Sequence, residues 1–541
     1  MSSSVEKSDV HDVSLTRRYT KDSALDKDDL ILAQLGYEPE LNRNFSVWSV
    51  LGVGFGLTNS WFGISASLVT GISSGGPMMI VYGIMIIAAV STCIGITLSE
   101  LASAYPSSGG QYVWAKVLAP KYPVLAFLCG SFSYAGSIFS STSTTVATVQ
   151  IAVAFYELTH ADYEFKRWHV FVAFQILNFF IFFFNCYAKF LPSIAKSSLY
   201  ISLGSFIVIT ITVLACSSGH FQDAKFVFSD FDNQTGWESA GIAFIIGLIN
   251  PNWSFSCLDC ATHMAEEVAQ PERVIPIAIM GTVAIGFFTS FVYCISMFFS
   301  IRDLDALLNT ATGAPIISIY YQALQNQGGA IFLGFLLFLT ACGCLISGHT
   351  WQMRLCWSFA RDNGLPFSSF LSKVDKRMGI PFNAHLFSVC LCSLVSCLYL
   401  ASDLAYNSLV TGCITFLLLS YAIPVSCLIY NGRDSITHGP FWIGKFGYFT
   451  SSMTVAWALF ALVFYSFPFV KPVTKSNMNY AAAAIVGWLV VSVVYWFSYG
   501  KKIFIMRNED DEDAVLKKIF AKTESHREKD ATIPVEVTKE L

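Results

Sequence analysis

The sequence predicts an all-α polytopic membrane protein with about 12 transmembrane helices, and three observations support this fold class. First, 54% of the 541 residues are hydrophobic and only 13% are charged, whereas soluble domains carry about 25% charged residues. Second, the mean hydropathy of +0.55 suits lipid better than water. Third, apolar runs of about 20 residues, the length that spans a bilayer, recur along the chain. We expect these spans at 45–70, 75–103, 123–157, 168–188, 194–217, 239–263, 275–300, 329–357, 383–402, 404–431, 446–469 and 477–499.

Polar segments flank the expected membrane domain, 45–500. Residues 1–44 are rich in Ser and Asp and are expected to form a disordered tail, as is the charged segment 501–541. An even number of spans places both tails on one side, and the loops on that side carry most of the Lys and Arg residues. We therefore expect cytoplasmic termini. The loop 218–238 would then lie outside, where Asn233 begins a glycosylation sequon.

Composition and motifs exclude several classes of function. The net charge is −4 and no dense basic patch occurs, so no nucleic acid partner is expected. The 15 cysteines lie mostly in apolar runs and predict no disulfide framework. Cys257 and Cys260 have the spacing of a metal or redox pair, but no second pair accompanies them, so no metal is expected. The sequence contains no P-loop and no catalytic constellation, so we expect neither an enzyme nor a cofactor.

Two of the expected spans contain residues that damage a helix. The first holds four glycines around Asn59, and the sixth holds Asn250-Pro251-Asn252. Glycine costs about 1 kcal/mol and proline about 3 kcal/mol in a helix interior, and lipid offers no water to the freed backbone groups. Broken spans at matching places in two halves of a chain indicate a transport site. The alternative is that small residues allow tight helix crossing, which explains glycines in one span better than the matched pair.

Aromatic side chains surround both breaks. Trp61 and Phe62 lie in the first span, and Trp253 and Phe255 lie in the sixth. An ammonium group over an aromatic ring gains about 0.5–2 kcal/mol, and aromatic cages recognise quaternary ammonium groups. Such a group has no N–H to donate, so ring faces select it where hydrogen-bond acceptors cannot. The four residues predict a cage for a small amine, with gating or plain packing as the alternative.

Ionisable side chains inside a span are costly and point to function by default. Asp259 follows the break in the sixth span. We expect it either to balance a cationic substrate or take a coupling proton, or to pair with a polar neighbour. Histidine titrates near physiological pH, so His349 in the eighth span is either a core residue or a cavity residue that could take up a proton.

Other charged residues lie near the inner ends of spans. Glu100, near the inner end of the second span, is expected to be structural. Glu266 and Glu267 follow the sixth span and are expected to form a cytoplasmic gate with Arg273 or Arg361.

Several motifs resemble those of one transporter family. Ser99–Tyr112, Ala265–Arg273 and Ala360–Pro366 occur in the order and at the spacing found in the amino acid–polyamine–organocation superfamily. Phe45–Trp61 is similar to the fungal amino acid/choline transporter branch of this superfamily. Within that branch, Leu248–Ala265 is similar to the choline and ethanolamine permeases.

The resemblance covers about 45–500 and implies a five-plus-five inverted repeat over about 45–217 and 239–431, with two additional helices over about 446–499. It implies a plasma-membrane permease that imports choline, and ethanolamine, by alternating access. Several bacterial relatives carry a lysine in helix five in place of a coupling cation. Leu199–Ile209 has none, so proton coupling stays open. The matched substrate positions, with Asp259 added as a contact for a cation, are Ser60, Trp61, Phe62, Gly63, Tyr134, Trp253, Ser254, Phe255, Ser256, Cys257 and His349.

Other interpretations stay open. A permease for γ-aminobutyrate or another small amine would share the fold and bind the substrate carboxylate through free N–H groups of a broken helix. A non-transporting sensor would be expected to add a long soluble domain, and a membrane enzyme would need a catalytic constellation. A cation entering at −100 mV gains about 2.3 kcal/mol, so import does not strictly require a coupled ion.

Overall fold

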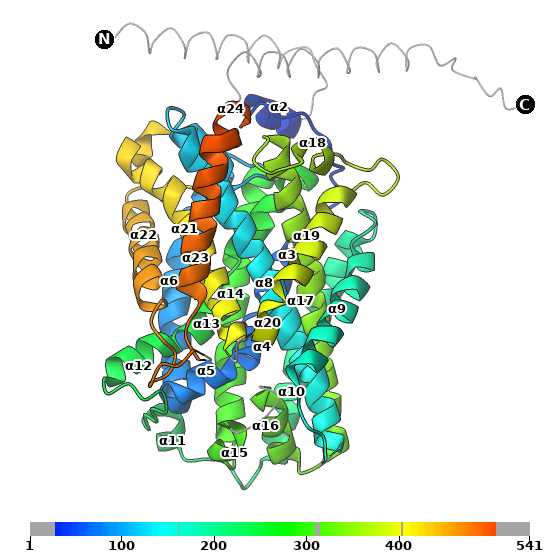
Figure 1. Ribbon diagram of the computed structural model, residues 1–541, viewed down its shortest axis with the longest axis vertical. Helices are drawn as coiled ribbons and strands as arrows, with labels where there is room; N and C mark the ends of the chain where they lie inside the picture. Colours follow the sequence, from blue (N-terminus) through cyan, green and yellow to red (C-terminus); the bar gives the residue numbers. More distant parts are fainter. Residues whose placement is uncertain (1–26, 161, 309–313, 402–403, 476, 505–541) are drawn as a thin grey trace, which may run out of the picture. The chain divides into compact units, whose positions relative to one another are not determined.

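The computed structural model describes 27–160, 162–308, 314–401, 404–475 and 477–504 (Figure 1). The chain divides into two compact units, one formed by 41–506 and the other by 1–40 together with 507–541.

The described part of the smaller unit, 27–40, contains helix α2 (Lys27–Gln34). The expectation of a tail disordered throughout 1–44 is wrong for this helix. Asp28 and Asp29 favour its first turn through the helix dipole, and the Leu and Ala residues that follow are good helix formers. Residues 1–26 and 505–541 of the expected tails lie outside the described residues.

The larger unit is a bundle of membrane-spanning helices, which confirms the predicted fold class. Eleven helical segments in the described residues are long and apolar enough to cross a membrane. The first expected span adds one more segment to these eleven. It is broken into α3 (Val47–Thr58), α4 (Ser60–Ala66) and α5 (Leu68–Ser73). The eleven are α6 (Gly76–Ala104), α8 (Pro123–Thr159), α9 (Arg167–Phe184), α10 (Leu191–Cys216), α12 to η1 (Ala240–Glu267), α14 (Pro271–Phe299), α17 (Gln327–Arg361), α19 with α20 (Phe382–Leu400), α21 (Ala405–Asn431), α22 (Phe446–Phe464) and α23 to α24 (Ala481–Ile503).

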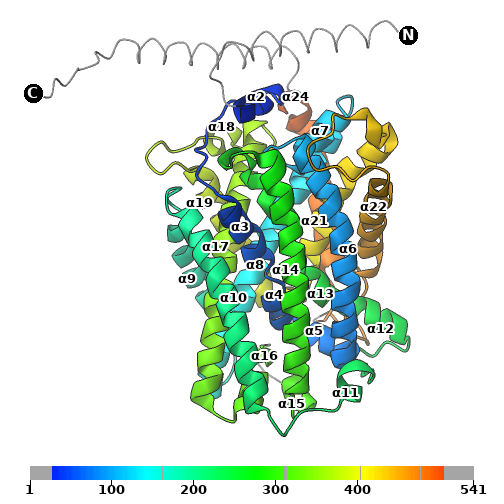
Figure 2. The same ribbon diagram turned by 180° about the vertical axis from the view of Figure 1, so that it is seen from behind.

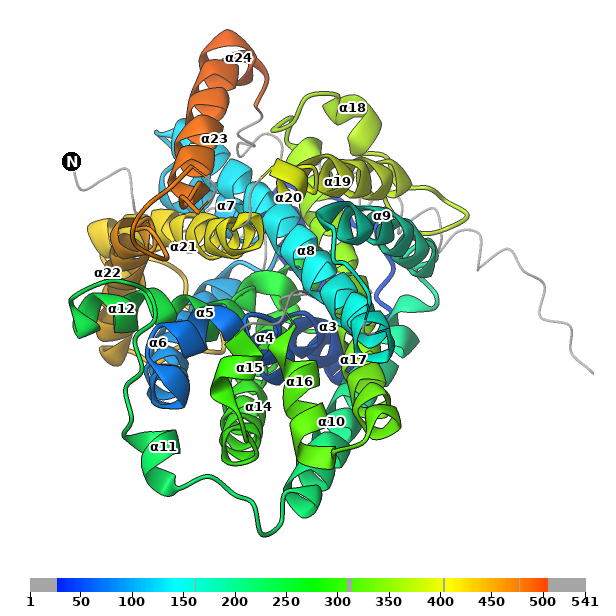
Figure 3. The same ribbon diagram turned by 60° about the horizontal axis from the view of Figure 1, so that its bottom comes forward.

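Short helices mark the two ends of the bundle. α7, α18 and α24 lie at one end, and α11, α15 and α16 lie at the other (Figures 1 and 2). Seen from the second end, α22 and α23 lie at the edge of the bundle (Figure 3). The bounds of these short helices are α7 (Gln111–Leu118), α11 (Ala224–Phe228), α15 (Leu304–Leu308), α16 (Pro315–Leu324), α18 (Ser368–Leu371) and α24 (Lys501–Ile503).

Four of the first five spans pack against their counterparts in the next five. α6 packs along α14, α8 along α17, and α9 along α19, while α3 and α4 contact η1 and α13 of the sixth span. α6 runs from the α11 end toward α7, and α14 runs the opposite way (Figure 2). Pairing of a span with the one five positions later, in the opposite direction for α6 and α14, is the arrangement that two inverted halves produce.

The third span, α8, lies at the centre of the bundle although it is rich in hydroxyl groups. Thr142, Thr145 and Thr148 each donate to the carbonyl oxygen four residues earlier, at 2.7 Å. These bonds within the helix satisfy polar groups that lipid or an apolar core would leave unpaired. A polar helix can therefore occupy the interior, where it reaches both broken spans.

Candidate functional site

The first span is interrupted at Ser67, between α4 and α5, and at Asn59. Its backbone has φ 28° and ψ 67° and separates α3 from α4. Asparagine tolerates positive φ better than most residues, and the Asn59 side chain donates to Ser202 Oγ of α10 at 2.9 Å. The break is therefore held against α10 by neutral groups.

The glycines of this span have another role than the one expected of them. A Cβ at Gly52 would lie 2.5 Å from the carbonyl oxygen of Ala195 in α10, and a Cβ at Gly63 would lie 2.8 Å from the Cα of Ser254. These glycines allow close helix crossing, as the alternative interpretation proposed. The span is broken where Asn59 lies, between the glycines.

The break in the sixth span also differs in position from the expected one. Asn250-Pro251-Asn252 lies inside α13 (Ile249–Ser254), directly after α12 (Ala240–Gly247). Proline is tolerated in the first turn of a helix, where the backbone N–H has no partner within that helix. Pro251 is the third residue of α13. The chain leaves the helix at 255–257, and Cys257 has the left-handed conformation with φ 64°.

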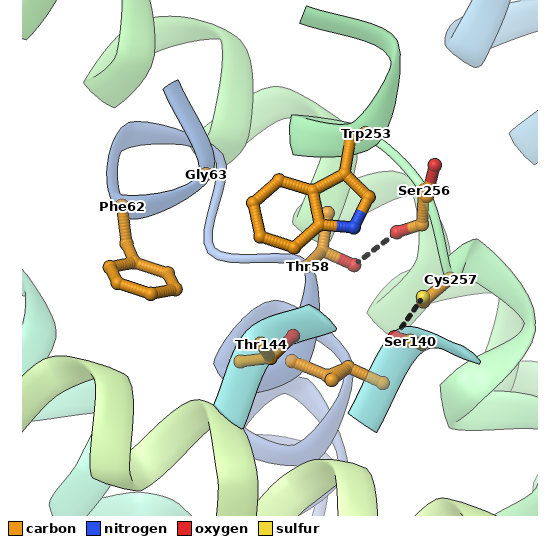
Figure 4. Close-up of a pocket in the computed structure, with 9 residues that line it drawn as sticks. Thr58, Phe62, Gly63, Ser140, Thr144, Trp253, Ser256 and Cys257 are labelled. Atoms are coloured by element: carbon orange, nitrogen blue, oxygen red, sulfur yellow. Dashed lines mark hydrogen bonds between the residues drawn. The ribbon is translucent and has the colours of Figure 1, made fainter. Parts of the chain in front are cut away.

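A small cavity lies where the two breaks meet α8. Its volume is about 10 Å³, room for about a single water molecule, so a bound organic substrate requires the site to widen. Figure 4 shows the rings of Phe62 and Trp253 facing this space, with hydroxyl side chains beside them. The lining residues are Leu57, Thr58, Phe62, Gly63, Ser140, Thr144, Trp253, Ser256 and Cys257.

Two polar contacts join the three elements around the cavity (Figure 4). Thr58 Oγ1 donates to the carbonyl oxygen of Ser256 at 3.0 Å, which links the first span to the second break. Ser140 Oγ of α8 lies 3.3 Å from Cys257 Sγ. One carbonyl freed by the sixth-span break is thus bonded by a side chain of the first span, as a backbone group inside a membrane requires.

Five of the expected substrate residues line the cavity: Phe62, Gly63, Trp253, Ser256 and Cys257. Three neighbours on the same segments turn away from it. Ser60 and Phe255 face Gly286 of α14, and the Ser254 hydroxyl donates to the carbonyl of Asn250 at 2.9 Å.

Trp61 does not belong to the cavity, so the structure shows no cage of Trp61 with Trp253. Its ring is fully buried, with its centroid 5.2 Å from that of Tyr293 and 6.4 Å from that of Phe206. Its indole N–H donates to Ser202 Oγ at 3.0 Å. Successive residues on a helix point about 100° apart, and of this adjacent pair Phe62 is the residue that lines the cavity.

Tyr134 and His349 also lie outside the lining, although the family resemblance implied them. The Tyr134 hydroxyl lies 2.9 Å from Ser388 Oγ of α19. The His349 ring centroid lies 5.6 Å from that of His385, also in α19. In this structure both side chains pack toward α19, and the proton role of His349 stays untested.

Four lining residues were not predicted from the sequence: Leu57, Thr58, Ser140 and Thr144. The run of six hydroxyl residues at 140–145, in the middle of an expected span, was the signal that could have found the last two.

Asp259 lies beyond the cavity, in the 3₁₀ segment η1 (Leu258–Glu267). One carboxylate oxygen accepts from the Tyr421 hydroxyl at 2.5 Å, and the other lies 3.1 Å from His263 Nε2. Its side chain has no exposed surface. Of the roles expected for Asp259, pairing with polar neighbours is the one seen, and it makes no contact with the cavity.

The end of η1 carries two buried ion pairs with α17. Arg361 donates to both oxygens of Glu266 at 2.8 and 3.0 Å, so Arg361, rather than Arg273, is the partner. Arg354 donates to both oxygens of Glu267 at 2.5 and 3.0 Å, a partner that the sequence did not suggest. Two-pronged pairs of this kind are the strongest that Arg forms with a carboxylate.

Glu100 has a structural position apart from the cavity. Its Oε1 accepts from Arg433 at 2.8 Å and from the backbone N–H of Ile443 at 3.0 Å. The Arg433 guanidinium also lies 4.3 Å from the centroid of the Trp442 ring. The pair joins α6 to the segment between α21 and α22.

Asn233 lies in the loop between α11 and α12, at the end opposite the ion pairs. Its amide donates to the Trp237 carbonyl at 2.7 Å, and its oxygen accepts from the Thr235 hydroxyl and backbone N–H at 2.6 and 3.0 Å. The sequon thus forms a hydrogen-bonded turn.

Comparisons with known proteins agree on one kind of protein. A family profile described as "Amino acid permease" matches residues 45–491. The chain is 61% identical to the choline transporter of Saccharomyces cerevisiae, over 91% of this chain and 88% of that protein. It is 34% identical to the 7-keto 8-aminopelargonic acid transporter of the same yeast, over 84% of this chain and 92% of that protein. It is also 34% identical to the swainsonine transporter swnT of Arthroderma benhamiae, over 86% and 92%.

Proposed function

Because this chain belongs to the amino acid permease family, we propose that it is a plasma-membrane secondary transporter that imports choline, and also ethanolamine, by alternating access. The high identity to a yeast protein named a choline transporter supports the choice of substrate. Relatives at lower identity carry names with other substrates, so the family membership alone does not decide it.

The observation that carries the choline proposal is the pairing of Phe62 and Trp253 across the two breaks. A quaternary ammonium group presents no N–H, so ring faces are the groups that attract it. Trp253 is itself held edge-on by Tyr406 of α21, with ring centroids 6.2 Å apart. The cavity lining contains hydroxyls and a thiol but no carboxylate, which suits a cation stabilised mainly by aromatic faces.

Two observations support alternating access. The cavity is closed, and two ion pairs lie toward the end of the bundle that carries α7 and α18. The cavity, at about 10 Å³, is too small for choline, so the bundle must open to load and to release it. The Glu266–Arg361 and Glu267–Arg354 pairs tie η1 to α17 at the end that carries α7 and α18. We propose that these pairs are the inner gate and that they separate when substrate leaves.

The orientation follows from charge. The end with α7, α18 and α24 holds most of the Lys and Arg of the loops, so we propose that it faces the cytoplasm together with both termini. The loop with Asn233 then faces outward, where glycosylation can occur.

The test is uptake of radiolabelled choline into proteoliposomes that contain the full chain, with unlabelled ethanolamine and γ-aminobutyrate as competitors. We expect saturable uptake that ethanolamine inhibits. No choline uptake, with saturable uptake of radiolabelled γ-aminobutyrate in its place, would identify a permease for zwitterions and overturn the choline assignment.

A further inference from the structure

A buried polar cluster lies between the cavity and the proposed inner gate. Asp259 accepts from the Tyr421 hydroxyl at 2.5 Å, and its other oxygen, Oδ2, lies 3.1 Å from His263 Nε2. The second ring nitrogen of His263, Nδ1, lies 2.7 Å from the carbonyl oxygen of Ser108. Neither Asp259 nor His263 has exposed side-chain surface. We call these two residues the Asp259–His263 pair.

These contacts require a proton between the two residues. A carbonyl oxygen only accepts, so Nδ1 of His263 carries a hydrogen toward Ser108. The Nε2–Oδ2 contact then needs a further hydrogen, on the imidazolium or on the carboxylic acid, because two lone pairs would otherwise face each other without water. In either form the pair holds one proton more than a carboxylate with a neutral imidazole.

The groups around the pair keep their charge states, so this proton is the charge that changes. Thiols and a phenol are neutral at cellular pH, and the nearby guanidinium is already bound to Glu267. The titratable or charged groups that interact with Asp259 or lie on or against its segment include Cys129 of α8, Tyr421 of α21, Cys257 and Cys260 of the sixth span, Glu266 and Glu267 of η1, and Arg354 and Arg361 of α17, the last of which is bound to Glu266.

We propose that the Asp259–His263 pair binds a proton that enters the cell with each substrate molecule. The inference rests on the proposed function and adds the coupling group. The pair lies in η1, which begins next to the cavity residue Cys257 and ends at the gate residues. Ser108, whose carbonyl accepts from His263, also donates its backbone N–H to Glu266 at 3.3 Å. Proton site and gate therefore share one loop residue.

The proton balance is simple. One proton from the external solution binds the pair when the transporter is open outward, and the same proton passes to cytoplasmic water after the gate opens. The pair is left as a carboxylate with a neutral imidazole, and lone pairs then face each other across Nε2 and Oδ2. Their repulsion loosens the hold of η1 on Ser108 and Tyr421, so release of the proton favours the open gate.

The test measures proton entry with choline in proteoliposomes that hold a pH-sensitive dye, with the membrane potential clamped at zero by potassium and valinomycin. The wild type is expected to acidify the lumen when choline enters from an acidic exterior. Asp259→Asn should retain choline exchange, because its amide can donate to Nε2 and accept from Tyr421, and should lose the acidification. His263→Gln should lose it too, and a buried histidine in α19 provides the matched control His385→Gln, which should keep it.

The outcomes separate this proposal from the proposed function. Unchanged acidification per choline in both Asp259→Asn and His263→Gln would overturn the proton site, as would saturable choline uptake by the wild type with no proton entry. No choline uptake by correctly inserted wild type would overturn the proposed function instead. If Asp259→Asn does not fold, His263→Gln carries the same test.

Discussion

The two broken spans are held in different ways. The first is interrupted at Asn59 and again at Ser67, and neutral hydrogen bonds from Asn59 and Trp61 to Ser202 tie it to α10. The sixth is interrupted over 255–257 and continues as η1, whose ionisable side chains contact α21, the loop before α7, and α17. The first span therefore resembles a fixed frame for the cavity, whereas the sixth links the cavity to charges that can change or separate.

The largest expected effect concerns the charged side of this comparison. Arg354→Ala leaves the buried Glu267 carboxylate without its two-pronged partner, which should cost about 3–5 kcal/mol of stability. Thermal unfolding in detergent checks it. The matched control is Lys166→Ala, which breaks an exposed pair with Glu164 and should cost about 0–1 kcal/mol. Equal shifts for the two variants would show that the η1–α17 pair adds no stability.

Trp61→Ala should damage the frame instead of the substrate site. It removes a fully buried ring between α10 and α14, and such truncations cost about 3–5 kcal/mol of stability. We expect little folded protein at the membrane, but a near wild-type KM for choline in the fraction that folds. A large rise in KM with normal folding would return Trp61 to the substrate site.

Trp253→Ala should show the reverse pattern. The ring lines the cavity, and loss of a cation–π contact of about 0.5–2 kcal/mol raises KM about 2- to 30-fold. Concentration-dependent choline uptake measures it. Trp168→Ala, at an exposed tryptophan of α9, should leave KM unchanged. Normal KM in Trp253→Ala would remove the aromatic basis of choline selection.

The smallest expected effect tests the link between the two breaks. Thr58→Val removes the hydrogen bond to the Ser256 carbonyl, at a cost of about 0.5–1.5 kcal/mol. Thr148→Val in α8 is the control, because its hydroxyl only bonds a carbonyl of its own helix. A comparison of thermal stability and uptake rate should show loss of uptake only for Thr58→Val. Equal behaviour would mean that the two breaks are not coupled through this bond.

Much of the fold was within reach of the sequence. Hydropathy is a sum over neighbouring residues, so the spans, the polar flanks and the exceptional character of spans one and six could be identified without any tertiary contact. The clustering of aromatic residues at both breaks was also visible in the sequence, and Phe62 and Trp253 do line the cavity.

The side-chain directions could not be obtained in the same way. Trp61 and Phe62 are adjacent and similar in chemistry, and only the positions of α10 and α14 decide which one faces the cavity. The breaks shifted to Asn59 and to 255–257 because helix packing supplies or withholds backbone partners, whatever the local propensity of glycine and proline.

The sequence by itself determined that this chain crosses the membrane about a dozen times, with two damaged spans, aromatic residues beside them and charges after the sixth. The tertiary structure decided which charges meet. Arg354 lies 87 positions from Glu267, and Tyr421 lies 162 positions from Asp259. Buried charges need partners with correct geometry. Because helices far apart in the chain supply those partners, their identity depends on packing.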